Sequence, residues 1–194
     1  MLAGESETAA LVDRLAVRPG VDPASAAYAS RPYTEAKRWL SGEDDEPRHR
    51  FGRSELFSRS LPAEAIDALV ANLQRSPGAG EVNFLPLGGA YNRVPARATA
   101  FAHRDQRFLV EHVCYVDRDE RLPAEDGSST AMQWVLRSWG CVHPWGSGRV
   151  YPNFPEPGLA DWDAAYYGIN RERLLRVKRT YDPQGVLRSP RGPR

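Results

Sequence analysis

Apolar and polar residues alternate most clearly in the segment RFLVEHVCYVD, residues 107–117, and this alternation predicts a β-strand. Successive side chains of a strand point to opposite faces of the sheet. One face is therefore expected to carry Phe108, Val110, His112, Cys114 and Val116, and the other Leu109, Glu111, Val113 and Tyr115. Because both faces are largely apolar, we expect this strand to be central in its sheet and covered on both sides. Weaker patterns predict strands at 52–59 and 81–89.

The clearest helical pattern lies in residues 61–76, where apolar residues recur at the spacing of one helix face. The stripe consists of Ile66, Leu69, Val70 and Leu73, and Pro62 suits the first turn. Shorter patterns predict helices at 6–16, 128–139, 161–168 and 169–181.

Polar residues before these helices are candidate N-caps: Ser128 or Ser129, Asp161 and Asn170. In the helix 169–181 we expect the apolar side chains of Leu174, Val177 and Tyr181 to point inward. Residues 17–50 are predicted to be mostly irregular and to end in the charged loop 41–50. Helices and strands that alternate irregularly predict an α+β fold, with an antiparallel sheet covered by helices.

The composition is that of a globular domain, because 41% of the 194 residues are hydrophobic and 26% are charged. The 26 basic and 25 acidic residues nearly balance, which argues against a nucleic-acid-binding surface and leaves a small molecule as the expected ligand. No apolar run is long enough to span a membrane, and the N-terminus lacks the pattern of a signal peptide. We therefore expect a cytoplasmic protein that does not insert into membranes.

The sequence contains none of the common short motifs of hydrolases, metalloproteases or nucleotide-binding loops. Cys114 and Cys141 are too few for a disulfide framework or a zinc site. His112 lies two residues before Cys114 and shares its strand face, but no third metal ligand is in sight, so a core histidine is the simpler interpretation. We expect no metal.

Aromatic residues and an asparagine concentrate in the last third of the chain: Trp134, Trp139, Trp145, Tyr151, Asn153, Phe154, Trp162, Tyr166 and Tyr167. Aromatic side chains beside Gly and Pro turns can form a wall for a planar ligand, and a tyrosine there can act as a general base. The alternative is that these aromatics simply pack at helix ends.

The order of motifs in this region resembles the C-terminal segment of the berberine bridge enzyme-like flavoproteins. The resemblance is carried by YPNF (151–154) and by WDAAYYGINRERLLRVKRTYDPQGVLRSP (162–190). Upstream, LPLGGAYNRVPARATAFAHR (85–104) resembles the Gly-Gly strand of that family and its following Thr-Ala-Phe-x-His-Arg element.

The resemblance implies the substrate domain of an FAD-linked oxidoreductase at 1–148, with its first strand missing, and a berberine-like segment at 149–194 packed with it as one unit. Such enzymes oxidise alcohols, sugars or natural-product scaffolds of secondary metabolism by hydride transfer to flavin. The FAD-binding domain of the family is absent from residues 1–194, so a possible partner is an FAD-binding domain on a separate chain. FAD is not expected to bind tightly to this chain alone.

Carried over by position, the resemblance implies a catalytic role for Tyr151 and for Tyr91. It implies flavin contacts for Asn153, Gly88, Gly89, His103 and Arg104, although for His103 and Arg104 the favoured interpretation is that they brace their loop. It implies substrate contacts for Asn92, Phe154 and His112, with Phe154 standing where the family often has Tyr.

Two other functions remain open from the sequence. The first is a flavin-free protein that binds a natural product, or cyclises one, with the aromatic wall and a Tyr base. The second is a non-catalytic, degenerating fragment.

Overall fold

The computed structural model describes residues 5–17, 31–41, 48–77, 79–117, 130–156 and 158–187. The chain forms two compact units, residues 1–46 and residues 47–194. The predicted boundary between 148 and 149 lies inside the second unit and stays a prediction.

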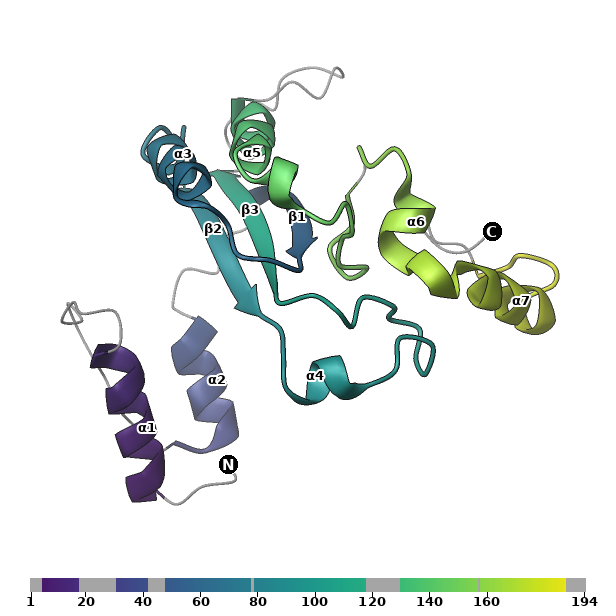
Figure 1. Cartoon of the computed structure of the whole chain (residues 1–194), viewed down its shortest axis with the longest axis horizontal. Helices are drawn as coiled ribbons and strands as arrows, with labels where there is room; N and C mark the ends of the chain where they lie inside the picture. The colour runs from purple at the N-terminus through teal and green to yellow at the C-terminus, as the bar shows by residue number, and fades with distance from the viewer. Residues whose placement is uncertain are drawn as a thin grey trace. The chain divides into compact units, whose positions relative to one another are not determined.

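The larger unit is built on an antiparallel three-stranded sheet in the order β1-β3-β2 (Figure 1). The strands are β1 (Arg48–Phe57), β2 (Ala79–Pro86) and β3 (Phe108–Asp117). Phe108, the first residue of β3, pairs with Phe57 on one side and Pro86 on the other. The central position of β3 and the α+β class predicted from the sequence are confirmed. Both faces of β3 are also buried, with Val110 and Val113 fully enclosed.

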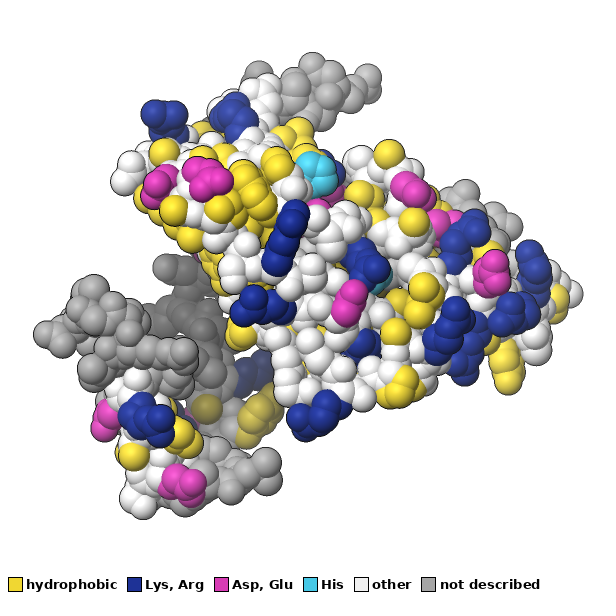
Figure 2. All heavy atoms as spheres, viewed as in Figure 1, with side chains coloured by type: hydrophobic (Ala, Val, Ile, Leu, Met, Phe, Trp, Pro, Cys, Tyr) yellow, Lys and Arg dark blue, Asp and Glu magenta, His cyan; other side chains and the backbone are white. Residues whose placement is uncertain are grey.

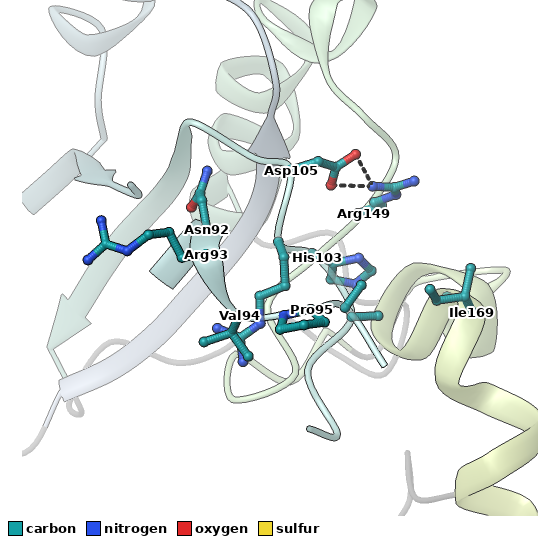
Figure 3. A pocket seen from close by; sticks show the side chains of 12 residues that line it. Asn92, Arg93, Val94, Pro95, His103, Asp105, Arg149 and Ile169 are labelled. Atoms are coloured by element: carbon teal, nitrogen blue, oxygen red, sulfur yellow. Dashed lines mark hydrogen bonds and ion pairs between the residues drawn. The ribbon is translucent and has the colours of Figure 1, made fainter. Parts of the chain in front are cut away.

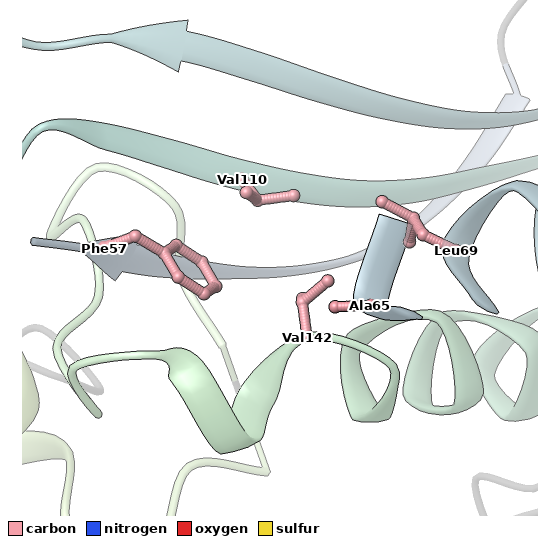
Figure 4. Close-up of a cluster of buried hydrophobic side chains, with 5 residues drawn as sticks. All are labelled: Phe57, Ala65, Leu69, Val110 and Val142. Carbon is pink, nitrogen blue, oxygen red and sulfur yellow. The ribbon is translucent and has the colours of Figure 1, made fainter. Parts of the chain in front are cut away.

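Helices α3 (Ala63–Leu73) and α5 (Thr130–Gly140) lie side by side on one face of the sheet (Figure 1). Trp134 of α5 joins them by donating its indole N–H to the backbone oxygen of Asn72, 2.9 Å away. The core beneath α3 consists of Phe57, Ala65, Leu69, Val110 and Val142 (Figure 4). A second cluster beneath α5 consists of Cys114, Ala131, Trp134 and Val135.

Only part of the apolar stripe of α3 is buried in this core. Leu69 is 4% exposed, whereas Ile66 is 47% and Val70 50% exposed. Hydrophobic side chains accordingly gather on the molecular surface over α3 (Figure 2).

The connections around the sheet carry short helices. They are α4 (Ala90–Arg93), the 3-10 helices η1 (His143–Trp145) and η2 (Gly168–Asn170), α6 (Trp162–Tyr167) and α7 (Arg171–Tyr181). Val150, Ala165 and Tyr166 form a third buried cluster, which fixes α6 against the segment that follows η1. Among the described residues, no helix is long and apolar enough to cross a membrane.

The smaller unit, residues 1–46, contains α1 (Glu5–Val17) and α2 (Tyr33–Ser41). Helix α2 corrects the expectation that residues 17–50 are mostly irregular. Its start is stabilised by hydrogen bonds from the N–H groups of Glu35 and Ala36 to the carbonyl of Pro32, 3.0 and 2.9 Å long.

Several local expectations were wrong at element ends. Strand β1 begins at Arg48, inside the predicted charged loop, because these polar residues pair in register with the end of β3. Strand β2 ends at Pro86, before the two glycines. The side chains of Asp161 and Asn170 make no capping hydrogen bond. Ser128 and Ser129 lie outside the described residues.

Helix α7 also departs from expectation, because Val177 is 46% exposed and Tyr181 82% exposed, so neither points inward. Asn170 at its start is buried instead. Its side-chain amide donates to the backbone oxygens of Ala96, at 2.7 Å, and Thr99, at 3.0 Å. Asn170 therefore ties the C-terminal helices to the loop between α4 and β3.

Candidate functional site

Four aromatic side chains from three separate segments form one continuous cluster. The ring of Phe101 lies 5.5 Å from that of Tyr91 and 5.9 Å from that of Tyr151, measured between centroids. Tyr151 in turn lies edge-on to Phe154, with centroids 5.2 Å apart. Offset and edge-on contacts of this kind stabilise aromatic pairs. The fold thus brings together Tyr91, Tyr151 and Phe154, which the sequence had singled out separately.

Within this cluster, Asn153 donates its side-chain N–H to the phenolic oxygen of Tyr151, 3.0 Å away. The hydrogen bond leaves the hydroxyl proton of Tyr151 free to be donated or lost. The amide of Asn153 therefore fixes the position of the phenolic oxygen of Tyr151.

Tyr91 is arranged differently. Its hydroxyl donates to the backbone oxygen of His103 at 2.8 Å. Burial raises the pKa of Tyr91 to about 12, although the nearby charge of Arg104 acts in the opposite direction. A base needs a pKa near the working pH, so the geometry favours an orienting role for Tyr91 rather than proton abstraction.

A pocket of about 740 Å³ has a size that holds a small molecule (Figure 3). The four aromatic side chains do not line it, but His103 and Arg104 do, and both contact the ring of Phe101. Three residues implied by the resemblance line it together: Asn92, His103 and Arg104. The remaining wall includes Asp105 and Arg149, which form an ion pair with N–O distances of 2.8 and 3.0 Å (Figure 3). In Figure 3 the imidazole of His103 lies between Pro95 and Ile169.

His103 connects the pocket to the C-terminal helices. Its side chain is 1% exposed, and Nε2 lies 3.0 Å from the backbone oxygen of Tyr166. Burial and the charge of Arg149 lower the pKa of His103, so the ring is neutral at physiological pH. Arg104 donates to the backbone oxygens of Tyr91 and Phe101, at 3.3 Å each. Both residues thus brace the loop while they line the pocket, and their proposed flavin contacts stay predictions.

Three of the residues implied by the resemblance do not join this site. Gly88 and Gly89 form the turn before α4, where Gly89 has φ 57° and neither glycine has a neighbour within 4 Å of an added Cβ. His112 is fully buried beneath α5, where Nδ1 lies 2.8 Å from the hydroxyl of Ser138. Burial, and secondarily the charge of Arg53, lowers the pKa of His112 to about 4. A substrate cannot reach this ring in the described conformation, whereas the core interpretation of His112 agrees with its position.

Sequence reasoning missed a polar group beside the cluster. Arg50 of β1 forms an ion pair with Glu111 of β3, and its guanidinium lies 5.9 Å from the ring of Phe154. Asn83 of β2 donates to the same carboxylate at 3.5 Å. The available signal was Glu111 itself, a charged residue in an otherwise apolar central strand.

Comparison with known proteins now gives this site a context. Residues 150–192 match the family model described as "Berberine and berberine like". The uncharacterized FAD-linked oxidoreductase YgaK of Bacillus subtilis is 31% identical over 170 residues, which cover 86% of this chain and 36% of YgaK. Reticuline oxidase of Eschscholzia californica is 23% identical over 159 residues, covering 70% of this chain and 28% of that enzyme.

Solved structures share the fold. Berberine bridge enzyme from Eschscholzia californica superposes with a TM-score of 0.67 at 23% identity, over 75% of this chain and 33% of the enzyme. BBE-like #28 from Arabidopsis thaliana superposes with a TM-score of 0.74 at 19% identity, over 99% of this chain and 45% of that protein. The chain thus spans less than half the length of these relatives.

The resemblance drawn from the sequence is confirmed. The chain is related to the berberine bridge enzyme-like FAD-linked oxidoreductases, and its α+β sheet and helices match the corresponding part of their fold.

Proposed function

We propose that this chain supplies the substrate-binding and C-terminal part of an FAD-linked oxidoreductase that acts on an alcohol, a sugar or a natural-product scaffold. An FAD-binding part outside residues 1–194 completes the enzyme. The observation that carries the proposal is the hydrogen bond from Asn153 to Tyr151 within the aromatic cluster beside the pocket. It holds the proposed proton acceptor in a cluster that reaches the pocket through His103 and Arg104.

The described residues fit one part of FAD. Tyr151 lies edge-on to both Phe101 and Phe154, so one of these rings can stack on a planar ring while the Asn153 amide contacts its polar edge. The full sequence contains no glycine-rich fingerprint for a diphosphate, so that part of the cofactor requires the FAD-binding partner. When bound, FAD supplies the acceptor for the hydride that leaves the alcohol carbon.

The chain's own residues handle the proton and the position of the substrate. In this proposal Tyr151 takes up the hydroxyl proton of the substrate, and Asn153 orients the phenolic oxygen through their hydrogen bond. Asn92 lines the pocket, and its amide N–H is held by the backbone oxygen of Gln106 at 2.9 Å, so its side-chain oxygen is left to accept from a substrate hydroxyl. Tyr91 and Phe101 lie behind Arg104, which forms the wall of the pocket on the side of the aromatic cluster.

One observation favours the second candidate function, a flavin-free protein that binds or cyclises a planar natural product. The pocket of about 740 Å³ has the size of a small-molecule site. Such a protein would bind its ligand as an isolated chain.

The test is a titration of the purified chain with FAD, followed by flavin fluorescence and visible absorbance. The titration is performed alone and with the FAD-binding half of a related oxidase. Saturable binding that requires the added half supports the oxidoreductase. A folded monomer that binds no FAD under either condition contradicts it and leaves the flavin-free candidate.

A further inference from the structure

Two charged residues of β1, one buried and one half-buried, lie on the side of the sheet that α5 covers. The side chain of Glu55 is 2% exposed and that of Arg53 is 17% exposed. They lie two positions apart on the same strand, and their partners across the sheet are His112 and Val110 of β3. Buried charges persist only when other groups pair with them, so their partners indicate what they do.

Glu55 holds the chain where it approaches the YPNF segment. Its carboxylate accepts hydrogen bonds from the backbone N–H of Gly148 at 2.7 Å and from the ring nitrogens of Trp139 and His143 at 2.8 Å each. Gly146 leaves the space for this carboxylate, because an added Cβ would lie 2.1 Å from Glu55 Oε1.

The backbone next to Glu55 continues the attachment. The N–H of Leu56 donates to the oxygen of Arg149 at 2.8 Å, and the N–H of Ser147 donates to the oxygen of Leu56 at 3.0 Å. The Ser147 hydroxyl donates to that same oxygen at 2.6 Å. The start of the YPNF segment is therefore held in a defined position beside β1.

Arg53 holds the chain where the YPNF segment ends. Its Nε lies 2.6 Å from a carboxylate oxygen of Glu156, whose side chain is 2% exposed. The guanidinium of Arg53 also lies 3.7 Å from the centre of the Trp139 ring, a cation–π contact that fixes its plane. The N–H of Glu156 donates to the hydroxyl of Tyr166 at 2.9 Å.

We propose that Arg53 and Glu55 are positioning residues for the Tyr151–Asn153 pair. One strand holds both ends of the short loop, at Gly148 and at Glu156, and Tyr151 and Asn153 lie between these two points. A loop fixed at both ends loses fewer conformations when it meets its ligand. We call this attachment of residues 148–156 to Arg53 and Glu55 the clamp. Its importance for catalysis rests on the proposed function, but its restriction of the loop's motion does not.

The test uses hydrogen exchange of the backbone amides in the full chain. The variants are Arg53→Met, Glu156→Gln and the double variant, with Arg53→Lys as the conservative change and Glu81→Gln, an exposed charge on β2, as the matched control. We expect amides of 149–156 to exchange about tenfold faster in Arg53→Met and in Glu156→Gln, with β3 amides unchanged. Because both residues form one ion pair, the double variant should match the single variants. Arg53→Lys should retain most of the protection, and Glu81→Gln all of it.

The same variants are then mixed with the FAD-binding half of a related oxidase, and turnover and the flavin absorption spectrum are measured. Loosening of 149–156 together with a lower kcat and an altered flavin spectrum supports positioning. Unchanged exchange in 149–156, or equally faster exchange throughout β3, overturns the clamp. If the unaltered chain does not bind flavin, the proposed function fails, while the exchange experiment still decides whether the clamp exists.

Discussion

The side-chain amide of Asn153 donates a hydrogen bond to the phenolic oxygen of Tyr151 across 3.0 Å. Two residues apart in a short loop, they face the same aromatic group, in which Phe101 contacts Tyr151. The hydroxyl of Tyr91 is instead used in a hydrogen bond to the backbone of His103. The structure therefore distinguishes the two tyrosines that the sequence alone treated alike.

Replacing Tyr151 by Phe tests this distinction in the enzyme reconstituted with an FAD-binding half. Loss of the proton acceptor should lower kcat/KM by about 10²- to 10⁴-fold, the usual contribution of a general base, while flavin affinity changes little. Tyr91→Phe should cost far less, because its hydroxyl only orients the loop. Steady-state kinetics with an alcohol substrate provides the measurement.

The matched control for Tyr151→Phe is Tyr181→Phe, because Tyr181 is 82% exposed at the end of α7. Equal losses for the Tyr151 and Tyr91 variants would contradict the assignment of Tyr151 as the base. So would full activity of Tyr151→Phe.

Replacing Gly146 by Ala tests how tightly the loop is fitted to Glu55. The new Cβ would lie 2.1 Å from the Glu55 carboxylate, so either the loop or the buried carboxylate must move. We expect the free energy of unfolding to fall by about 1–3 kcal/mol, as for other overpacked sites. Urea denaturation followed by tryptophan fluorescence measures the change.

Gly140→Ala is the control for this substitution. Gly140 ends α5, and an added Cβ there meets nothing within 4 Å. The Gly140→Ala substitution should leave the free energy of unfolding unchanged or raise it slightly, because Ala favours a helix more than Gly does. If both glycine variants behave alike, the close fit between Gly146 and Glu55 is wrong.

Periodicity was sufficient to predict the centre of the fold. Residues 107–117 had apolar side chains on both faces, and β3 is the buried central strand. It was insufficient at β1, whose first residues are charged and adopt a strand only because β3 offers a partner in register. Helix α2 was missed because it has only nine residues and more than half of them are polar, although its few apolar residues share one face.

The site was predictable only in part for a similar reason. A resemblance can mark Tyr151, Asn153 and His103, because each lies in a recognisable string of residues. It cannot show that His112 faces Ser138 beneath a helix, because the direction of a strand residue depends on which face the helices cover. The roles of Arg53 and Glu55 were equally invisible, since their partners lie 84 or more positions away in the sequence.

The two apolar sides of α3 should respond very differently to truncation. Leu69 is 4% exposed and contributes to the core with Phe57 and Val110, whereas Ile66 is 47% exposed. Leu69→Ala should cost about 2–5 kcal/mol of unfolding free energy, because it leaves a cavity. Ile66→Ala should cost less than about 1 kcal/mol, and chemical denaturation of both variants measures the difference. A large loss at Ile66 would mean that its side of α3 is covered in the protein in solution.

The stability of the chain should fall between neutral and mildly acidic pH because of His112. Its pKa is lowered to about 4 by burial, whereas an unfolded histidine titrates near its ordinary value of 6.5. The unfolded chain therefore binds a proton as the pH falls below 6.5, and the native chain resists doing so until about pH 4. The stabilising contribution is fully present above pH 6.5 and is lost progressively towards pH 4. It amounts to a few kcal/mol, on the order of 3.

His112→Gln removes this titration, so the difference in unfolding free energy between pH 7 and pH 4.5 should shrink relative to the unaltered chain in urea denaturation. His103, whose pKa is also lowered by burial, continues to contribute in the variant, so the pH dependence is reduced but not abolished. An identical pH dependence in both proteins would show that His112 is protonated, or exposed, in the native state.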